Sequence, residues 1–215
     1  MDTAVALVQA YLRVNGYFTV AEYPIVEAAR GDGHRSLTDI DILAFRFAGA
    51  GREIVGAGRR TVDAERHEPD PLLGREGGLA DMLVGEVKEG RARLNQAARD
   101  PAVLRAALVR FGCCTVEEAP RIVSELGRQG QTTTDAGHRI RMVVFGSALD
   151  ERDSGAFAFI PLGHIVQFLE GHLRDHRELV RHVQTKEPVL GFLLTLEKAR
   201  RGTPQPPAVA IGDDR

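Results

Sequence analysis

Cysteine is scarce in this sequence of 215 residues, and the two cysteines, Cys113 and Cys114, are adjacent. Neighbouring cysteines form neither the disulfide framework of small secreted domains nor the paired CxxC spacing of a structural zinc site. The chain also lacks a run of 18 apolar residues, and its first residues lack the basic start that precedes the apolar core of a signal peptide. We therefore expect a soluble cytoplasmic protein with no membrane segment.

A surplus of basic charge is missing as well. Lys and Arg number 28 against 30 Asp and Glu, for a net charge of −2, which excludes a protein held to nucleic acid by bulk charge alone. Only three of the basic residues are lysines: Lys88, Lys186 and Lys198. A lysine kept in a sequence that prefers arginine can mark a position that needs a compact ammonium charge, and Lys88 is the first to consider.

The composition, with 43% hydrophobic and 27% charged residues, is that of a folded soluble protein, and the length favours one dominant domain. Residue periodicity and turn signals predict an α/β fold. Residues 1–160 form its core, with an insertion loop at 49–79, followed by a helical extension at 161–200 and a disordered tail at 201–215. The predicted helices are 3–15, 91–111 with a break at 100–101, 115–126 from a capping box to a stop at Gly127, 164–183 and 188–199. The predicted strands are 17–28, 37–47, 81–88, 139–145 and 156–161.

Acidic residues interrupt two of these strands. Strict alternation places Asp39 and Asp41 on one face of strand 37–47, together with Leu43 and opposite Ile40. Glu86 and Lys88 share one face of strand 81–88 in the same way. If the two strands pair antiparallel, the side chains of Asp41, Glu86 and Lys88 can meet.

Such a group points to metal chemistry. Two carboxylates close together need a cation between them, and oxygen ligands suit Mg²⁺ or Mn²⁺. The ion would acidify a bound water, and the Lys88 ammonium would orient that water or stabilise developing charge. We therefore expect phosphodiester hydrolysis.

The segment TDIDIL, followed by an apolar strand that ends in Glu86-Val87-Lys88, resembles the PD-(D/E)xK nuclease superfamily over about residues 3–145. The resemblance implies a restriction-endonuclease-like core in the order helix, three strands, helix, strand, here with C-terminal helices, and a metal-dependent nuclease that acts on DNA. It also implies Asp41 and Glu86 as metal ligands, the backbone carbonyl of Val87 as a further ligand, and Lys88 as the catalytic lysine.

Other acidic residues are candidates for the metal-ligand role that the resemblance gives to Asp41. Asp39 ranks second to Asp41. Asp70, in a literal Pro-Asp pair, is a rival, but it follows a glycine-rich stretch in which nothing in the sequence fixes its carboxylate. Many relatives carry a glutamate on the first helix, and residues 3–15 contain none. Glu22 is a substitute to consider, although a solvent-facing strand glutamate is the favoured interpretation.

Polar residues follow Lys88 at the predicted start of helix 91–111, where their donors could hold a phosphate backbone: Arg91, Arg93, Asn95 and Gln96. DNA is the expected partner, and a homodimer is left open. The alternative function is a non-catalytic nuclease-fold module that binds nucleic acid or works in a complex through its C-terminal helices. His172 and His176 lie four residues apart on one of those helices, and we expect packing rather than zinc binding.

Overall fold

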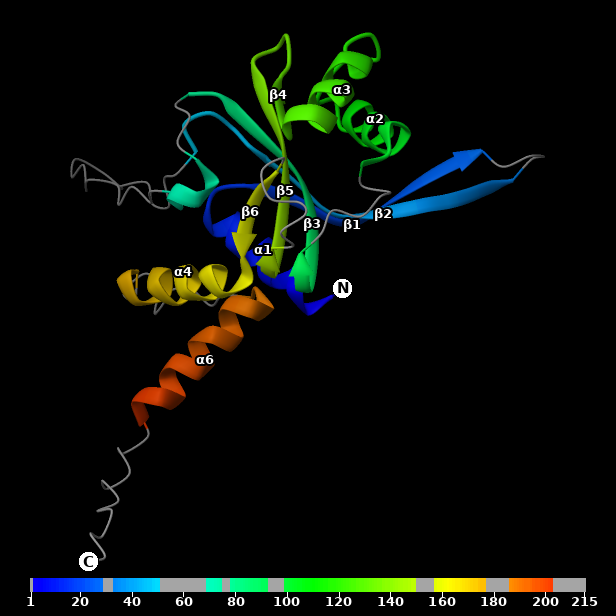
Figure 1. Ribbon diagram of the computed structural model, residues 1–215. Coiled ribbons are helices and arrows are strands. Elements are labelled where there is room, and N and C mark those ends of the chain that lie inside the picture. The colour runs from blue at the N-terminus through cyan, green and yellow to red at the C-terminus, as the bar shows by residue number, and fades with distance from the viewer. Residues whose placement is uncertain are drawn as a thin grey trace, which may run out of the picture. The chain divides into compact units, whose positions relative to one another are not determined.

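The computed structural model describes residues 2–28, 33–50, 69–74, 78–92, 99–149, 157–176 and 186–202. Two compact units divide the chain, Met1–Leu169 and Glu170–Arg215. The described part contains a six-stranded mixed sheet and five α-helices (Figure 1). The predicted α/β class is therefore confirmed.

Helix α1 spans Thr3–Val14, as the sequence predicts. The Asp2 side chain caps it by accepting a hydrogen bond of 2.7 Å from the Ala4 amide. Gly16, with φ +84°, then turns the chain into the first strand. The residues of α1 that are buried are Ala4, Val5, Val8, Gln9, Ala10, Tyr11 and Leu12.

The first three strands form an antiparallel meander: β1 (Phe18–Ala28), β2 (His34–Arg46) and β3 (Ala80–Ala92). The β2–β3 pairing runs from Ile42 opposite Gly85 to Arg46 opposite Asp81. The antiparallel pairing that the proposed site requires is therefore present.

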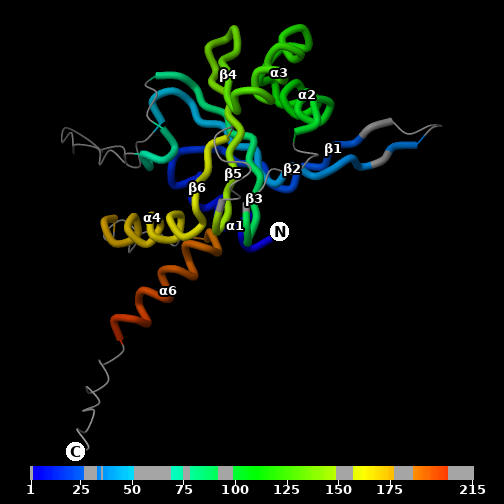
Figure 2. Tube along the Cα trace, viewed as in Figure 1, coloured from blue at the N-terminus to red at the C-terminus, as the bar shows by residue number. Residues whose placement is uncertain are grey.

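Strand β5 (His138–Leu149) lies parallel to β3 on its other side (Figure 2). The crossover between them carries α2 (Pro101–Arg110), α3 (Ala119–Gln129) and the short strand β4 (Gln131–Thr133). The sheet order is β1-β2-β3-β5-β4, and β6 (Ala158–Pro161) pairs in parallel with β5. Strand β3 is thus internal, which explains its buried apolar run from Met82 to Val84.

A hydrophobic cluster of buried residues joins α2 and α3 to the sheet. Its largest members are Ile25, Ile40, Leu43, Met82, Val84, Val103, Leu104, Leu108, Ile122, Val123, Leu126, Ile140, Met142 and Val144. Side chains of the neighbouring strands β2 and β5 approach the backbone of β3 closely at Gly85. A Cβ there would lie 2.4 Å from Ile42 Cγ2 and 2.9 Å from Phe145 Cε2, so only glycine fits immediately before Glu86.

Several predicted boundaries differ from the observed ones, among them those of β5, which was predicted at 139–145 and spans His138–Leu149. The sequence predicts a helix from residue 91, but β3 continues to Ala92, because Arg91 and Ala92 pair with Ala148 and Leu149 of β5. The stop predicted at Gly127 lies inside α3, which ends instead at Gly130, in the left-handed region with φ +69°. Strand β4 is not predicted, because three residues are too few to show alternation.

The hydrogen bonds of two predicted helix starts are present, although α3 begins at Ala119 and not at the predicted residue 115. Asp100 caps α2 through the Ala102 amide at 2.8 Å, and Pro101 occupies its first turn. Thr115 and Glu118 form a reciprocal capping box, since the Thr115 amide donates to Glu118 Oε2 at 2.9 Å and the Glu118 amide donates to Thr115 Oγ1 at 3.2 Å.

Helices α4 (Leu162–Asp175) and α6 (Pro188–Gly202) follow. Of the insertion predicted at 49–79, residues 49–50, 69–74 and 78–79 are described, and they include the 3-10 turn η1 (Pro71–Leu73). Residues 177–183 of the helix predicted at 164–183 lie outside the described residues. The tail predicted to be disordered from residue 201 begins too early, because Arg201 and Gly202 belong to α6, and residues 203–215 lie outside the described residues. Among the helices that are described, none has the length and apolar content of a membrane span.

Candidate active site

Strands β2 and β3 bring Asp41, Glu86 and Lys88 together. The Lys88 ammonium nitrogen lies 2.7 Å from Glu86 Oε1 and 3.8 Å from Asp41 Oδ2. One cation therefore sits within ion-pair distance of two carboxylates that are 45 positions apart in the sequence.

Asp41 stands where β2 leaves β3. The backbone pairing of the two strands ends at Ile42 and Gly85. Beyond that point the Val87 amide donates a 2.8 Å hydrogen bond to Asp41 Oδ2. The Asp41 side chain thus accepts a backbone hydrogen bond next to the end of the β2–β3 pairing, where a carbonyl of the neighbouring strand would otherwise accept it. This bond fixes the carboxylate against the strand that carries Glu86.

The strict alternation expected along β2 is wrong at this place. Ile40 was predicted on the face opposite Leu43, but both belong to the cluster under α2 and α3. On the neighbouring strand, Glu22 has a positive φ of +51° between the pairs Ala21–Ile42 and Tyr23–Ile40. This positive φ is a local irregularity of the β1 backbone beside residues 40–42 of β2.

The three side chains differ in exposure. The Glu86 side chain is 5% exposed, that of Asp41 24% and that of Lys88 42%. Burial raises the pKa of Glu86 and the negative charge of Asp41 raises it further, while the hydrogen bond from Lys88 opposes both. Burial lowers the pKa of Lys88, but its hydrogen bond to Glu86 and the two carboxylate charges outweigh burial, so the net pKa is raised. The ammonium therefore stays charged in this site.

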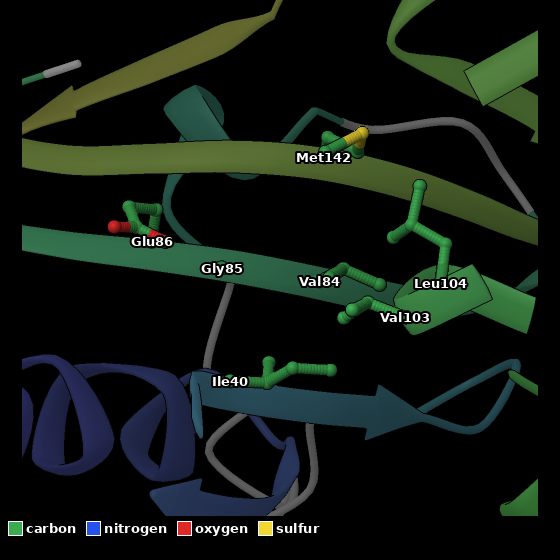
Figure 3. A pocket seen from close by; sticks show the side chains of 7 residues that line it. All are labelled: Ile40, Val84, Gly85, Glu86, Val103, Leu104 and Met142. Carbon is green, nitrogen blue, oxygen red and sulfur yellow. The ribbon is translucent and has the colours of Figure 1, made fainter. Parts of the chain in front are cut away.

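An apolar wall lies beside Glu86. A cavity of about 10 Å³, about the volume that one water needs, is lined by residues of β2, β3, α2 and β5 (Figure 3). Glu86 is the one polar residue among the seven that line it: Ile40, Val84, Gly85, Glu86, Val103, Leu104 and Met142. This surface accounts for the desolvation of the carboxylate.

The remaining predicted site residues are placed differently. Asp39 is exposed opposite Pro24 of β1, and the described contacts bring it to neither Glu86 nor Lys88. Arg91 is exposed on β3, so the prediction that it lies at a helix entrance is wrong. Arg93, Asn95 and Gln96 lie outside the described residues. The carboxylate of Glu22 accepts a 3.0 Å hydrogen bond from the Asp2 amide.

Asp70 is held firmly, contrary to the expectation that nothing fixes its carboxylate. It is 1% exposed and accepts hydrogen bonds from the Tyr11 hydroxyl at 3.0 Å and the Leu72 amide at 2.9 Å. His164 Nε2 lies 2.5 Å from Asp70 Oδ2. The Asp70 amide donates a hydrogen bond of 2.7 Å to Asn15 Oδ1. These partners tie η1 to α1 and α4, and they do not include Glu86 or Lys88.

Sequence reasoning also missed a buried ionic cluster. Asp81 of β3 accepts hydrogen bonds from Arg139 Nε at 2.8 Å, from Arg141 Nη2 at 2.7 Å and from the Tyr17 hydroxyl. Burial alone would raise the pKa of Asp81, but the bonds to both arginines and to Tyr17 hold it below its usual range. Two arginines at i and i+2 in an otherwise apolar strand were the available signal.

The carboxylates of Asp41 and Glu86 suit a hard divalent ion such as Mg²⁺ or Mn²⁺. Both carboxylates lie within ion-pair distance of one positively charged nitrogen, that of Lys88. Among the residues described, no group of three or more His, Cys, Asp or Glu side chains is placed to hold a metal ion. An ion here would take two carboxylates and complete its shell with backbone oxygen and water.

Comparison of the chain with protein-family models, with curated proteins and with solved structures finds no match. The functional interpretation therefore depends on the geometry of the site.

Proposed function

We propose that this chain is a metal-dependent phosphodiester hydrolase, a nuclease of PD-(D/E)xK type that acts on DNA. The observation that carries the proposal is the convergence of Asp41, Glu86 and Lys88 from two paired strands. Acid pairs with an adjacent lysine on an internal strand suit phosphoryl chemistry, because they can hold a divalent ion and a cationic side chain beside one phosphate.

The topology supports the same proposal. The order α1, antiparallel β1, β2 and β3, a helical crossover, and β5 parallel to β3 corresponds to the helix, three strands, helix, strand order of a restriction-endonuclease-like core. The candidate residues lie on the second and third of these strands, as the resemblance implies.

Each residue then has a defined task. Asp41 and Glu86, with the backbone carbonyl of Val87, would hold Mg²⁺ or Mn²⁺, and the bound ion would supply an acidified water and neutralise charge on the phosphate. The Val87 amide keeps the Asp41 carboxylate in place. The Lys88 ammonium, half-exposed beside both acids, orients the attacking water and stabilises negative charge that develops on the phosphate.

The exposed Arg91, three residues beyond Lys88 on β3, would contact the DNA backbone, and Arg93, Asn95 and Gln96 follow it in the chain. Both cysteines are free thiols, which supports action in the reducing cytoplasm.

One observation favours a second candidate, a non-catalytic module of nuclease fold that binds nucleic acid or works in a complex. Helix α1 carries no acidic residue, and no third acidic side chain joins Asp41 and Glu86 among the described residues. A module of this kind would bind DNA with affinity independent of divalent ions.

The two candidates are separated by cleavage of supercoiled, linear and branched DNA in Mg²⁺ or Mn²⁺. For the nuclease we expect metal-dependent cleavage that falls at least about 100-fold in Lys88→Ala. The exposed Lys198 provides the matched control, and Lys198→Ala should cleave like the wild type. Unchanged turnover in Lys88→Ala would remove the proposed mechanism, and DNA binding without cleavage in any of these conditions would favour the module.

A further inference from the structure

We propose that Lys88 sets the affinity of the site for its divalent ion, because its ammonium is a resident cation that an incoming ion must displace. This inference rests on the proposed function and adds a property to it. Lys88 then has a task before catalysis as well as during it.

The contacts define the competition. The ammonium nitrogen hydrogen-bonds Glu86 Oε1 at 2.7 Å and reaches Asp41 Oδ2 at 3.8 Å, so it uses the oxygens that a divalent ion would take. With Lys88 in place the three groups sum to a charge of about −1, and without it to about −2. A divalent ion is attracted more strongly to the second arrangement and loses no ion pair on entering it.

The acids are fixed, whereas the lysine can move. Glu86 is buried, and the Val87 amide holds Asp41. The Lys88 side chain is half-exposed, so its end can turn to solvent without burying a charge. Displacement therefore leaves a carboxylate pair that is already formed.

The choice of lysine fits this task. An arginine could pair with Glu86 through two parallel hydrogen bonds and would be harder to displace, whereas an ammonium makes a single-point contact. Lys88 is one of three lysines among 28 basic residues, so the position departs from the strong arginine preference of the chain.

The test is calorimetric titration of Mn²⁺ into the full chain at one pH and ionic strength, for the wild type, Lys88→Met and Lys88→Arg. Met preserves length and removes the charge, and Arg preserves the charge. Lys198→Met removes the same charge from an exposed position of α6 and serves as the matched control. The rise of the melting temperature with added Mn²⁺ provides a second readout that does not depend on activity and still reports if a variant is weakly folded without metal.

We expect Lys88→Met to bind Mn²⁺ at least about tenfold more tightly than the wild type, Lys88→Arg to bind no more tightly than the wild type, and Lys198→Met to be unchanged. The rise in melting temperature should follow the same order. Equal Mn²⁺ affinity in the wild type and Lys88→Met, or tighter binding by Lys88→Arg, would overturn the inference and leave the proposed metal site standing. Absence of Mn²⁺ binding in the wild type and in Lys88→Met would overturn the site and the inference together.

Discussion

The backbone amide of Val87 donates a 2.8 Å hydrogen bond to the Asp41 carboxylate and so joins the two strands of the candidate site where their ladder ends. The bond uses one carboxylate oxygen, Oδ2, and places Asp41 beside the neighbour of Val87, Glu86. The effect of the hydrogen bond that positions Asp41 and the effect of its negative charge can therefore be measured separately.

Asp41→Asn should keep the position and lose the charge. The amide oxygen of asparagine can still accept from Val87, so we expect a melting temperature close to that of the wild type and Mn²⁺ affinity at least about tenfold lower. Asp41→Ala removes both features and should lower both quantities. Calorimetry and thermal unfolding on the same samples check this, and equal Mn²⁺ affinity in Asp41→Asn and the wild type would contradict it.

Gly85→Ala should destabilise the protein by about 1–3 kcal/mol, because the new methyl group would meet Ile42 and Phe145 within contact distance. The strain falls next to Glu86, so DNA cleavage should drop as well. Urea unfolding measures the first effect. Gly90 lies on the same strand with open space around its Cβ position, and Gly90→Ala should stay near the wild type. A Gly85→Ala protein as stable as Gly90→Ala would refute the packing argument.

Asp81 should make stability depend on pH below about 4. Its pKa in the folded protein lies below the ordinary value of about 3.9, so the stabilisation is complete above that value and is lost as the pH falls through the folded pKa. Urea unfolding of the wild type and Asp81→Asn across pH 2–7 measures this. We expect Asp81→Asn to cost about 3–5 kcal/mol at pH 7 and less at low pH. A stability difference between the two proteins that stays constant over this range would contradict a lowered pKa of Asp81.

Asp70→Asn should affect folding and leave the metal site intact. The buried carboxylate accepts hydrogen bonds from Tyr11 and Leu72 and contacts His164, so losing its charge should cost about 1–3 kcal/mol in urea unfolding. Mn²⁺ affinity of the folded variant should equal that of the wild type. If Asp70→Asn abolished Mn²⁺ binding while the protein remained folded, Asp70 and not Asp41 would be the metal-binding aspartate.

The strands of the site could be predicted because their signal is local. Alternating or continuous apolar residues mark β2 and β3, and the charges at Asp41 and Glu86 stand out against them. Antiparallel pairing of consecutive strands then brings the two acids together. The burial of Ile40 and Leu43 in one cluster could not be predicted, because strict alternation places these two residues on opposite faces of the strand.

The features that sequence reasoning missed are non-local. Asp70 is fixed by Tyr11, 59 positions away, and by His164, 94 positions away, so its own segment contains no sign of its burial. Strand β3 extends to Ala92 because of pairing with β5, which lies beyond the whole crossover. Such contacts override local propensity, and periodicity in a short window cannot show them.

The central claim, that Asp41 and Glu86 share a divalent ion, is tested most directly by calorimetric titration of Mn²⁺ into the wild type and into the double variant Asp41→Asn/Glu86→Gln. We predict saturable Mn²⁺ binding in the wild type that is lost in the double variant while its fold, followed by circular dichroism, is retained. Equal Mn²⁺ binding by the two folded proteins would contradict the claim.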